Sequence, residues 1–358
     1  MDTLACGSVP AMLSVALDGN RANHVNYEAI PKTFEHQNGI VVTEKPIPPP
    51  WHFLKVAFQR TLSNSGMLGS RMTKKHVNEV LTTAKPEETL SFIVGLYLTH
   101  FPGQSTTFLN AVFGQVLSAF SGTYPGYQGC DTAFHDFAHT CQAAIAAVRI
   151  LDGQRKIGRS PVLTPREFEL CVAGILLHDI GLLKEVGDNS GTGAKYTLTH
   201  VDRGADFASK FLPAFYSTPD EVRLVQLGIH STAMDADMSN LSFRNVRERF
   251  IGCVIGTADL LGQMAAPNYP DQLPALYREF REAASYSHQR EGGIASYRSV
   301  EDLLRGTREF YQQYVRPMLE SRWDGVYKLL EYHYSDHRNH YLIAIELNLD
   351  RIDRRLKS

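Results

Sequence analysis

The chain has 358 residues, 43% of them hydrophobic, and a formal net charge of −2 at pH 7. This length and composition suffice for a large core in one or two domains, and the near-neutral charge argues against a surface for duplex nucleic acid. The sequence contains no apolar run of about 18 residues, which a membrane helix requires, and no basic stretch before its short N-terminal apolar segment. We therefore expect a cytoplasmic protein with no signal peptide, no membrane partner and no nucleic acid partner.

The cysteines are odd in number and lack CxxC spacing: Cys6, Cys130, Cys141, Cys171 and Cys253. That pattern is typical of reduced thiols in the cytoplasm rather than of a disulfide framework. The sequence leaves open whether the chain forms a homo-oligomer.

Residues 1–50 mix polar residues with glycine and end in the proline-rich run Pro46–Pro50. Neither a helix nor a central strand accommodates such a run, so we predict an extended or flexible arm. Beyond it, no segment shows convincing period-two alternation, and apolar residues recur at helical spacing. The prediction is an all-α fold with three parts after the arm: an N-terminal helical region (51–128), a catalytic core (129–320) and C-terminal helices (321–358).

The middle of the chain contains the clearest helix. Thr164-Pro165-Arg166-Glu167 has the pattern of a capping box with proline at the first helical position, and an apolar run follows up to Leu177. This helix would carry His178 and Asp179 into the interior, and Gly181 would end it. A buried carboxylate costs several kcal/mol unless it is paired or bound to a cation. The doublet is therefore a candidate pair of metal ligands.

Other predicted helices present further histidines and a carboxylate. His135 and His139 are four residues apart and would share one face of a helix that runs through 134–148. A second capping box at Thr218–Glu221 starts a helix expected to end near His230, and a long helix from about Ser242 contains Asp259.

Six metal-capable residues thus lie near the ends of apolar helices: His139, His178, Asp179, His200, His230 and Asp259. Four nitrogen or carboxylate ligands suffice for one divalent ion, and six suffice for two ions if one carboxylate is shared. Asp179 is the natural bridge. One ion would be held by His139, His178, Asp179 and Asp259, and the other by Asp179, His200, His230 and water. Such open coordination positions are typical of catalytic metals.

The order of these residues resembles the H…HD…D pattern of the HD-domain metal-dependent phosphohydrolases, in which His200 and His230 match the two additional histidines of the binuclear branch. The resemblance covers about residues 130–265. It implies an HD-domain helical bundle with a binuclear metal centre between its helices. It also implies an enzyme that hydrolyses a phosphoester with two divalent ions (Zn, Mn, Mg or Fe) and a hydroxide that bridges them beside Asp179.

The segment Phe134–His139 resembles the Y-H-N-x-x-H signature of class I cyclic nucleotide phosphodiesterases. This resemblance implies that His135 is the general acid that protonates the leaving oxygen. Phe310 falls where those enzymes clamp the base with an aromatic ring, whereas Thr307 replaces their purine-reading glutamine and Asp136 replaces their asparagine. The implied substrate is a small-molecule phosphoester or (cyclic) nucleotide, bound with weak discrimination between bases.

Three polar residues near the doublet and Asp259 are further candidate substrate contacts. Lys184 and Arg203 could neutralise a phosphate, and Gln263 lies one turn after Asp259 on the same helical face. We expect a solvated face, in contrast, for three histidines beyond the region of resemblance: His333, His337 and His340.

Two alternatives stay open at this point. The mixed-valent diiron oxygenases of the HD type use the same ligand types, and a catalytically silent HD domain could serve as a regulatory or binding module. The cyclic di-GMP branch fits less well, because the sequence has no GYP signature and Ser231 follows His230 where that branch has a second histidine.

Overall fold

The computed structural model describes residues 85–158, 160–286 and 297–357. They belong to one compact unit. The predicted N-terminal arm and the helical segment expected from Trp51 onward lie outside the described residues. Within those residues the chain forms eleven α-helices and no β-strand, which confirms the all-α prediction. The three-part division after the arm stays a prediction.

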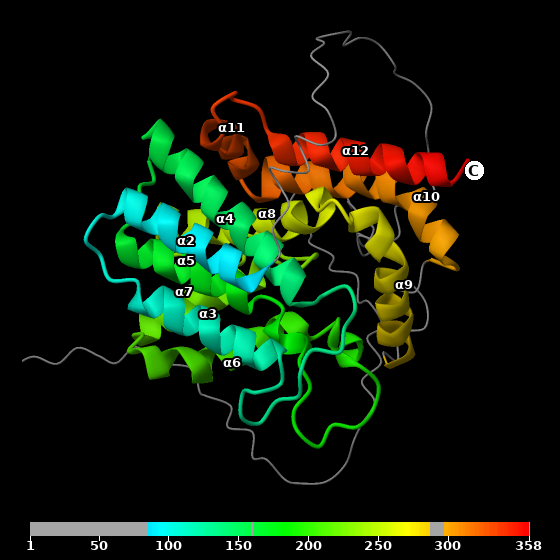
Figure 1. The fold of residues 1–358 in the computed structure, drawn as a ribbon, viewed down its shortest axis with the longest axis horizontal. Helices are drawn as coiled ribbons and strands as arrows, with labels where there is room; N and C mark the ends of the chain where they lie inside the picture. The colour runs from blue at the N-terminus through cyan, green and yellow to red at the C-terminus, as the bar shows by residue number, and fades with distance from the viewer. Residues whose placement is uncertain (1–84, 159, 287–296, 358) are drawn as a thin grey trace, which may run out of the picture. The chain divides into compact units, whose positions relative to one another are not determined.

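The helices follow one another along the chain in Figure 1 as α2 (Pro86–His100), α3 (Thr107–Phe120), α4 (Phe137–Ile157), α5 (Pro165–Leu177), α6 (His200–Phe211), α7 (Pro219–His230), α8 (Val246–Ala265), α9 (Tyr269–Tyr286), α10 (Val300–Phe310), α11 (Leu330–His333) and α12 (His340–Arg355). Short helical turns connect several of them: η2 (Ile180–Leu182), η3 (Gly193–Tyr196), η4 (Leu212–Phe215), η6 (Tyr311–Val315), η7 (Met318–Arg322) and η8 (Val326–Leu329).

Local sequence sets many of these helix boundaries. Capping boxes at Thr164 and Thr218, each followed by proline, start α5 and α7 as predicted. The Asn245 side chain accepts hydrogen bonds from two backbone N–H groups in the first turn of α8. This cap makes α8 begin about one turn later than the expected start near Ser242.

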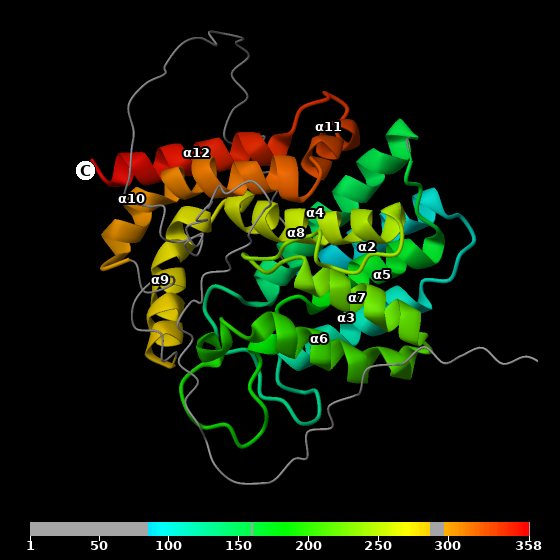
Figure 2. The ribbon, with the colours of Figure 1, turned by 180° about the vertical axis from the view of Figure 1, so that it is seen from behind.

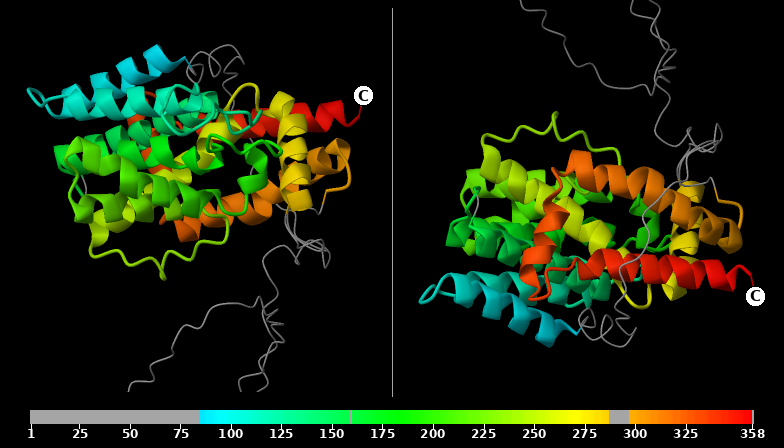
Figure 3. Two further views of the ribbon diagram at one scale, coloured as in Figure 1. Left: turned by 90° about the horizontal axis from the view of Figure 1, so that it is seen from below. Right: turned by 90° about the horizontal axis from the view of Figure 1, so that it is seen from above.

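The helices pack in layers around α4 and α5. Figure 3 shows α2 and α3 on one side of these two helices and α7 and α8 on the other. Buried side chains fill the space between the layers, among them Tyr97, Val148, Leu176 and Ile255. In Figure 2, α12 runs along the upper edge of the unit above α8. The N-terminal end of α4, the C-terminal end of α5 and the middle of α8 therefore meet inside the unit.

Helix α9 crosses the end of this bundle and departs from the direction of α8 by 114°. Among the described residues, no single helix has the length and apolar composition to cross a membrane. Only α8 and α9 taken together pass that test, as a sharply bent pair.

The expected solvated face near the C-terminus is wrong for two of its three histidines. His333 Nδ1 lies 2.6 Å from the buried carboxylate of Asp152, and His340 is 2% exposed. His337 is exposed. A buried carboxylate needs donors, and His333 supplies one from a distant part of the chain.

Candidate metal centre

His139 lies in the first turn of α4. The Asp136 side chain caps this helix by accepting a hydrogen bond from the His139 backbone N–H at 2.9 Å, so α4 begins only at Phe137. His135 therefore precedes the helix, and the prediction that His135 and His139 share one helical face is wrong. The cap leaves His135 in an irregular segment that can turn its ring independently of α4.

His178 and Asp179 follow directly after the last residue of α5. The helix ends at Leu177, and Gly181, which we expected to end it, lies within the turn η2 that follows. A β-carbon at Gly181 would collide with the carbonyl oxygen of His200. The glycine therefore allows the start of α6 to approach the turn that follows Asp179.

Four side chains converge where α4, α5 and α8 meet. His139 Nε2 lies 3.1 Å from His178 Nε2, and each of these atoms lies 3.2 Å from Asp179 Oδ2. Asp259 Oδ1 lies 3.3 Å from the first nitrogen and 3.5 Å from the second. His139, His178 and Asp179 thus form a buried group that could hold a metal ion, with Asp259 at its edge.

The spacing of the three ligand atoms in this buried group, His139 Nε2, His178 Nε2 and Asp179 Oδ2, fits a metal ion. Ligand atoms about 2.0–2.1 Å from a tetrahedrally coordinated ion stand about 3.3 Å apart, close to the distances above. Asp179 Oδ2 is buried without a hydrogen-bond partner among the described residues, which is costly unless a cation completes its surroundings. His178 Nδ1 donates to the Ile175 carbonyl at 2.7 Å, so Nε2 is the nitrogen that faces the group and that a metal ion would bind.

Charge in this group also favours a cation. Burial alone would raise the pKa of Asp179, but His178 and His139 hold it well below its ordinary value. Burial lowers the pKa of His139, yet Asp179 and Asp259 outweigh burial and raise it to about 9. Against the effect of burial, His178 and His139 also hold the pKa of Asp259 below its ordinary value. Both carboxylates are therefore ionised at neutral pH, and a divalent cation would replace imidazole protons as their counter-charge.

His200 and His230 differ in their relation to this group. His200 Nε2 lies 3.6 Å from Asp179 Oδ1, the other oxygen of that carboxylate. His230, the last residue of α7, has its Nδ1 3.6 Å from Asp202 Oδ1. The structure thus brings His200 close to Asp179, as the predicted second site requires. It pairs His230 with Asp202, a residue that the sequence pattern did not indicate. A second ion stays a prediction.

Glu279 of α9 is a functional candidate that the sequence pattern missed. It is 5% exposed, and it accepts hydrogen bonds from the Phe134 backbone N–H and from His135 Nδ1, each at 2.6 Å. Burial lowers the pKa of His135, but Glu279 and Asp179 outweigh it and raise the value above its ordinary range. Because Nδ1 is held by Glu279, Nε2 is the atom of His135 that can meet a substrate.

The two cations proposed as phosphate contacts make internal bonds. Lys184 Nζ lies 2.8 Å from Asp131 Oδ2. Arg203 donates to the carbonyls of Gly181 and Leu183 at 2.7 and 2.9 Å. These bonds tie both side chains to the frame around η2, and a direct contact with substrate stays a prediction for each.

Two other candidate substrate contacts lie on different helices. Gln263 Nε2 donates to Asp259 Oδ1 at 3.4 Å, so this amide lies beside a candidate metal ligand. Phe310 ends α10, and its ring stacks on that of Tyr314 with a centroid distance of 5.9 Å. Contact of Gln263 or Phe310 with a substrate stays a prediction.

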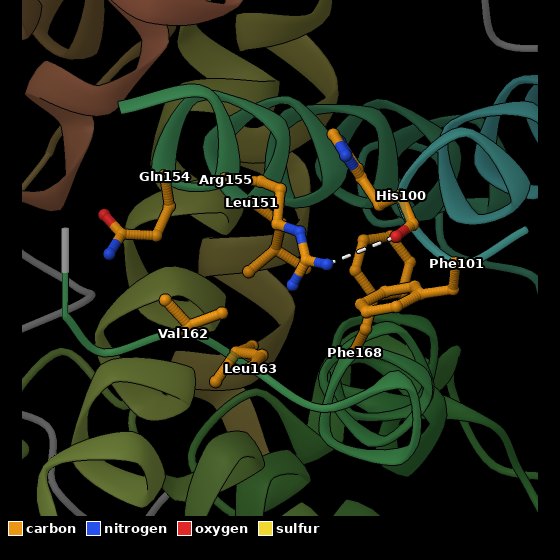
Figure 4. Close-up of a pocket in the computed structure, with 8 residues that line it drawn as sticks. All are labelled: His100, Phe101, Leu151, Gln154, Arg155, Val162, Leu163 and Phe168. Atoms are coloured by element: carbon orange, nitrogen blue, oxygen red, sulfur yellow. Dashed lines mark hydrogen bonds between the residues drawn. The ribbon is translucent and has the colours of Figure 1, made fainter. Parts of the chain in front are cut away.

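A small cavity lies near the other end of α4 (Figure 4). It is lined by His100, Phe101, Leu151, Gln154, Arg155, Val162, Leu163 and Phe168. Its volume of about 20 Å³ has room for about one water molecule. None of the candidate site residues lines it, so it offers no place for the predicted substrate.

Comparison with known proteins gives one partial similarity. A family model described as Npun_R2479-like matches residues 188–328, which is less than half of the chain. The matched range includes His200, His230, Asp259 and Glu279, but it starts after His139, His178 and Asp179. The comparison with curated proteins found no match.

Proposed function

We propose that the protein is a metal-dependent phosphohydrolase of the HD type that cleaves a phosphoester, with a (cyclic) nucleotide phosphodiester as the preferred substrate class. One observation carries the proposal. The ring of His135 lies 5.7 Å from that of His139, and its Nδ1 is bonded to the buried carboxylate of Glu279. A proton donor held beside a group of metal ligands suits the cleavage of a phosphoester.

The residues divide between two ions in this proposal. His139, His178, Asp179 and Asp259 would hold one ion, and Asp179, His200 and His230 would hold the other. Bound divalent ions would lower the pKa of a coordinated water and neutralise charge on the phosphoryl oxygens. The unpartnered Asp179 Oδ2 and the approach of His200 Nε2 to Asp179 Oδ1 support this division.

His135 would protonate the leaving oxygen. Its Nδ1–H stays bonded to Glu279, so the proton that moves is the one on Nε2. When the ester bond breaks, Nε2 gives this proton to the departing oxygen and the imidazole becomes neutral. Glu279 thereby fixes which nitrogen donates, and its charge favours the imidazolium before the step.

Thr307 supports weak discrimination between bases. It is 3% exposed, and its hydroxyl donates to the Leu303 carbonyl at 2.8 Å. The hydrogen of this hydroxyl is used within α10, and Thr307 lacks the side-chain amide that could donate to and accept from the edge of a purine at once. We expect turnover of cyclic nucleotides to differ little between adenine and guanine forms.

The test compares two histidine variants on a panel of phosphate monoesters and diesters. We expect His139→Ala to lose metal and all activity. His135→Ala should keep its metal, lose about 100-fold or more of its turnover of unactivated esters, and largely spare activated aryl diesters. Equal losses on both classes of ester, with metal retained, would contradict the role of His135.

The same preparations separate the alternative activities. Oxygen uptake with reduced iron, together with no phosphoester turnover, would replace the proposal with an oxygenase. A protein that binds metal but turns over neither class of substrate would be a binding or regulatory module.

A further inference from the structure

Helix α9 also holds a segment that leads to the candidate site, through Glu282, one turn after Glu279. Glu282 Oε2 accepts a hydrogen bond from the Thr192 hydroxyl at 2.7 Å, and Oε1 accepts one from the Thr192 backbone N–H. Thr192 lies in the segment between the η2 turn and His200. The two carboxylates of α9 thus hold different segments that border the site.

A continuous series of hydrogen bonds leads from Thr192 to His200. The Thr192 hydroxyl accepts from the Ala194 N–H at 3.2 Å and so caps η3. The Ala194 carbonyl accepts from the backbone and the hydroxyl of Thr197, at 3.0 and 2.6 Å. The Thr197 carbonyl accepts from His200 Nδ1 at 2.6 Å. Each bond in this series constrains the next residue toward the metal-ligand candidate.

Close packing holds this segment between α9 and η2. Gly191 adopts a φ of +54°, and a β-carbon there would lie 2.5 Å from Glu282 Oε1 and 2.6 Å from the Tyr286 hydroxyl. On the other side, a β-carbon at Gly193 would collide with the carbonyl oxygen of Leu182. The segment therefore has little room to shift independently of either neighbour.

We propose that Thr192, held by Glu282, is a positioning residue for His200. The series of bonds fixes the proton of the His200 imidazole on Nδ1 and directs Nε2 toward Asp179 Oδ1, 3.6 Å away. Removing a group that hydrogen-bonds a metal ligand directly, as the Thr197 carbonyl does for His200, typically changes metal affinity about 10–100-fold. Thr192 would act on His200 through that carbonyl. The expected effect of Thr192 on the affinity for a second ion rests on the proposed function. The positioning of His200 by Thr192 does not.

Cobalt titration tests this role with three variants. Thr192→Val removes the hydroxyl at nearly constant shape, Thr192→Ser restores it, and Thr199→Val removes an exposed hydroxyl next to His200 as a matched control. We expect Thr192→Val to bind the second equivalent of Co²⁺ at least tenfold more weakly and the first equivalent normally. Thr192→Ser and Thr199→Val should bind both equivalents like the wild type.

Hydrogen exchange of the metal-free protein gives an independent measurement. Residues 192–200 should exchange faster in Thr192→Val than in Thr199→Val, while α5 and α8 stay as protected as in the wild type. Unchanged exchange, unchanged cobalt binding, or loss of both cobalt equivalents in Thr192→Val would overturn the positioning role. If the wild-type protein binds only one equivalent of Co²⁺, the proposed binuclear centre is contradicted instead. The hydrogen-exchange result alone would then decide whether Thr192 positions His200.

Discussion

Gly262 of α8 lies against the backbone of Ala143 in α4, where a β-carbon at position 262 would meet the Ala143 N and Cα atoms at 2.8 Å. Asp259 precedes Gly262 by one turn, and His139 precedes Ala143 by one turn. The close approach of the two helices therefore underlies the 3.3 Å distance between His139 Nε2 and Asp259 Oδ1.

Gly262→Ala should push α4 and α8 apart, because the β-carbon meets backbone atoms rather than a side chain that can rotate. We expect a loss of about 1–3 kcal/mol of stability and metal binding that is weaker by at least tenfold. Urea unfolding and metal titration measure the two effects. Gly114→Ala is the control, since Gly114 is helical and exposed and its β-carbon would meet no atom within 4 Å beyond the adjacent backbone of its own helix. Normal metal affinity in Gly262→Ala would show that this contact does not position Asp259.

Glu279→Gln should lower turnover of unactivated phosphodiesters while metal content stays normal. The amide keeps the size of the side chain but removes the charge that favours the protonated imidazole of His135. Activated aryl diesters should be spared, as in His135→Ala. The double variant should be little worse than His135→Ala alone, because the two residues act as one unit. Additive losses would argue against their cooperation.

The sequence predicted helix boundaries correctly where interactions between residues close together in the chain determine them. The capping boxes at Thr164 and Thr218 start α5 and α7 because the bonds that make a cap lie within four residues. The same patterns indicated helix ends that carry His178 and His230. The start of α4 shows the limit of such local rules. Asp136 caps this helix by accepting a hydrogen bond from the His139 N–H, but the helical spacing of the sequence continues back through Asp136 and so predicts a start that is too early.

Residues brought in from distant helices could not be found in this way. Glu279 is one of several acidic residues on α9, and only the fold places it against His135, far away in the sequence. The pairing of His333 with Asp152 is of the same kind. Such contacts depend on how helices pack, and no spacing within one segment encodes them.

Asp152 should make stability depend on acid pH. It is 1% exposed, and burial alone would raise its pKa, but hydrogen bonds from His333 and Lys156 lower the value to about 2. A lowered carboxyl pKa stabilises the fold fully above the unfolded value of about 4. That contribution is lost as the pH falls through about 2.

Asp152→Asn should therefore be less stable than the wild type at pH 7, by about 1–3 kcal/mol once screening at the half-exposed Lys156 is allowed for. The difference should shrink as the pH falls from about 4 toward about 2. Urea unfolding of both proteins across this range measures it. A difference that stays constant over the whole range would mean that the ionised carboxylate is not its source.

Arg203→Lys separates a structural role from a substrate contact. The guanidinium donates to two carbonyls, of Gly181 and Leu183, and lies 3.6 Å from the centre of the Tyr196 ring. A lysine keeps the charge, but its ammonium group cannot donate to both carbonyls in the geometry of the guanidinium. It also lacks the flat surface that stacks on the tyrosine ring. If the role is structural, the variant should lose about 1–3 kcal/mol of stability with little change in KM. If Arg203 binds the phosphate, KM should rise while stability stays near that of the wild type. From the internal bonds we expect the first result, and thermal unfolding together with steady-state kinetics on one diester would distinguish the two.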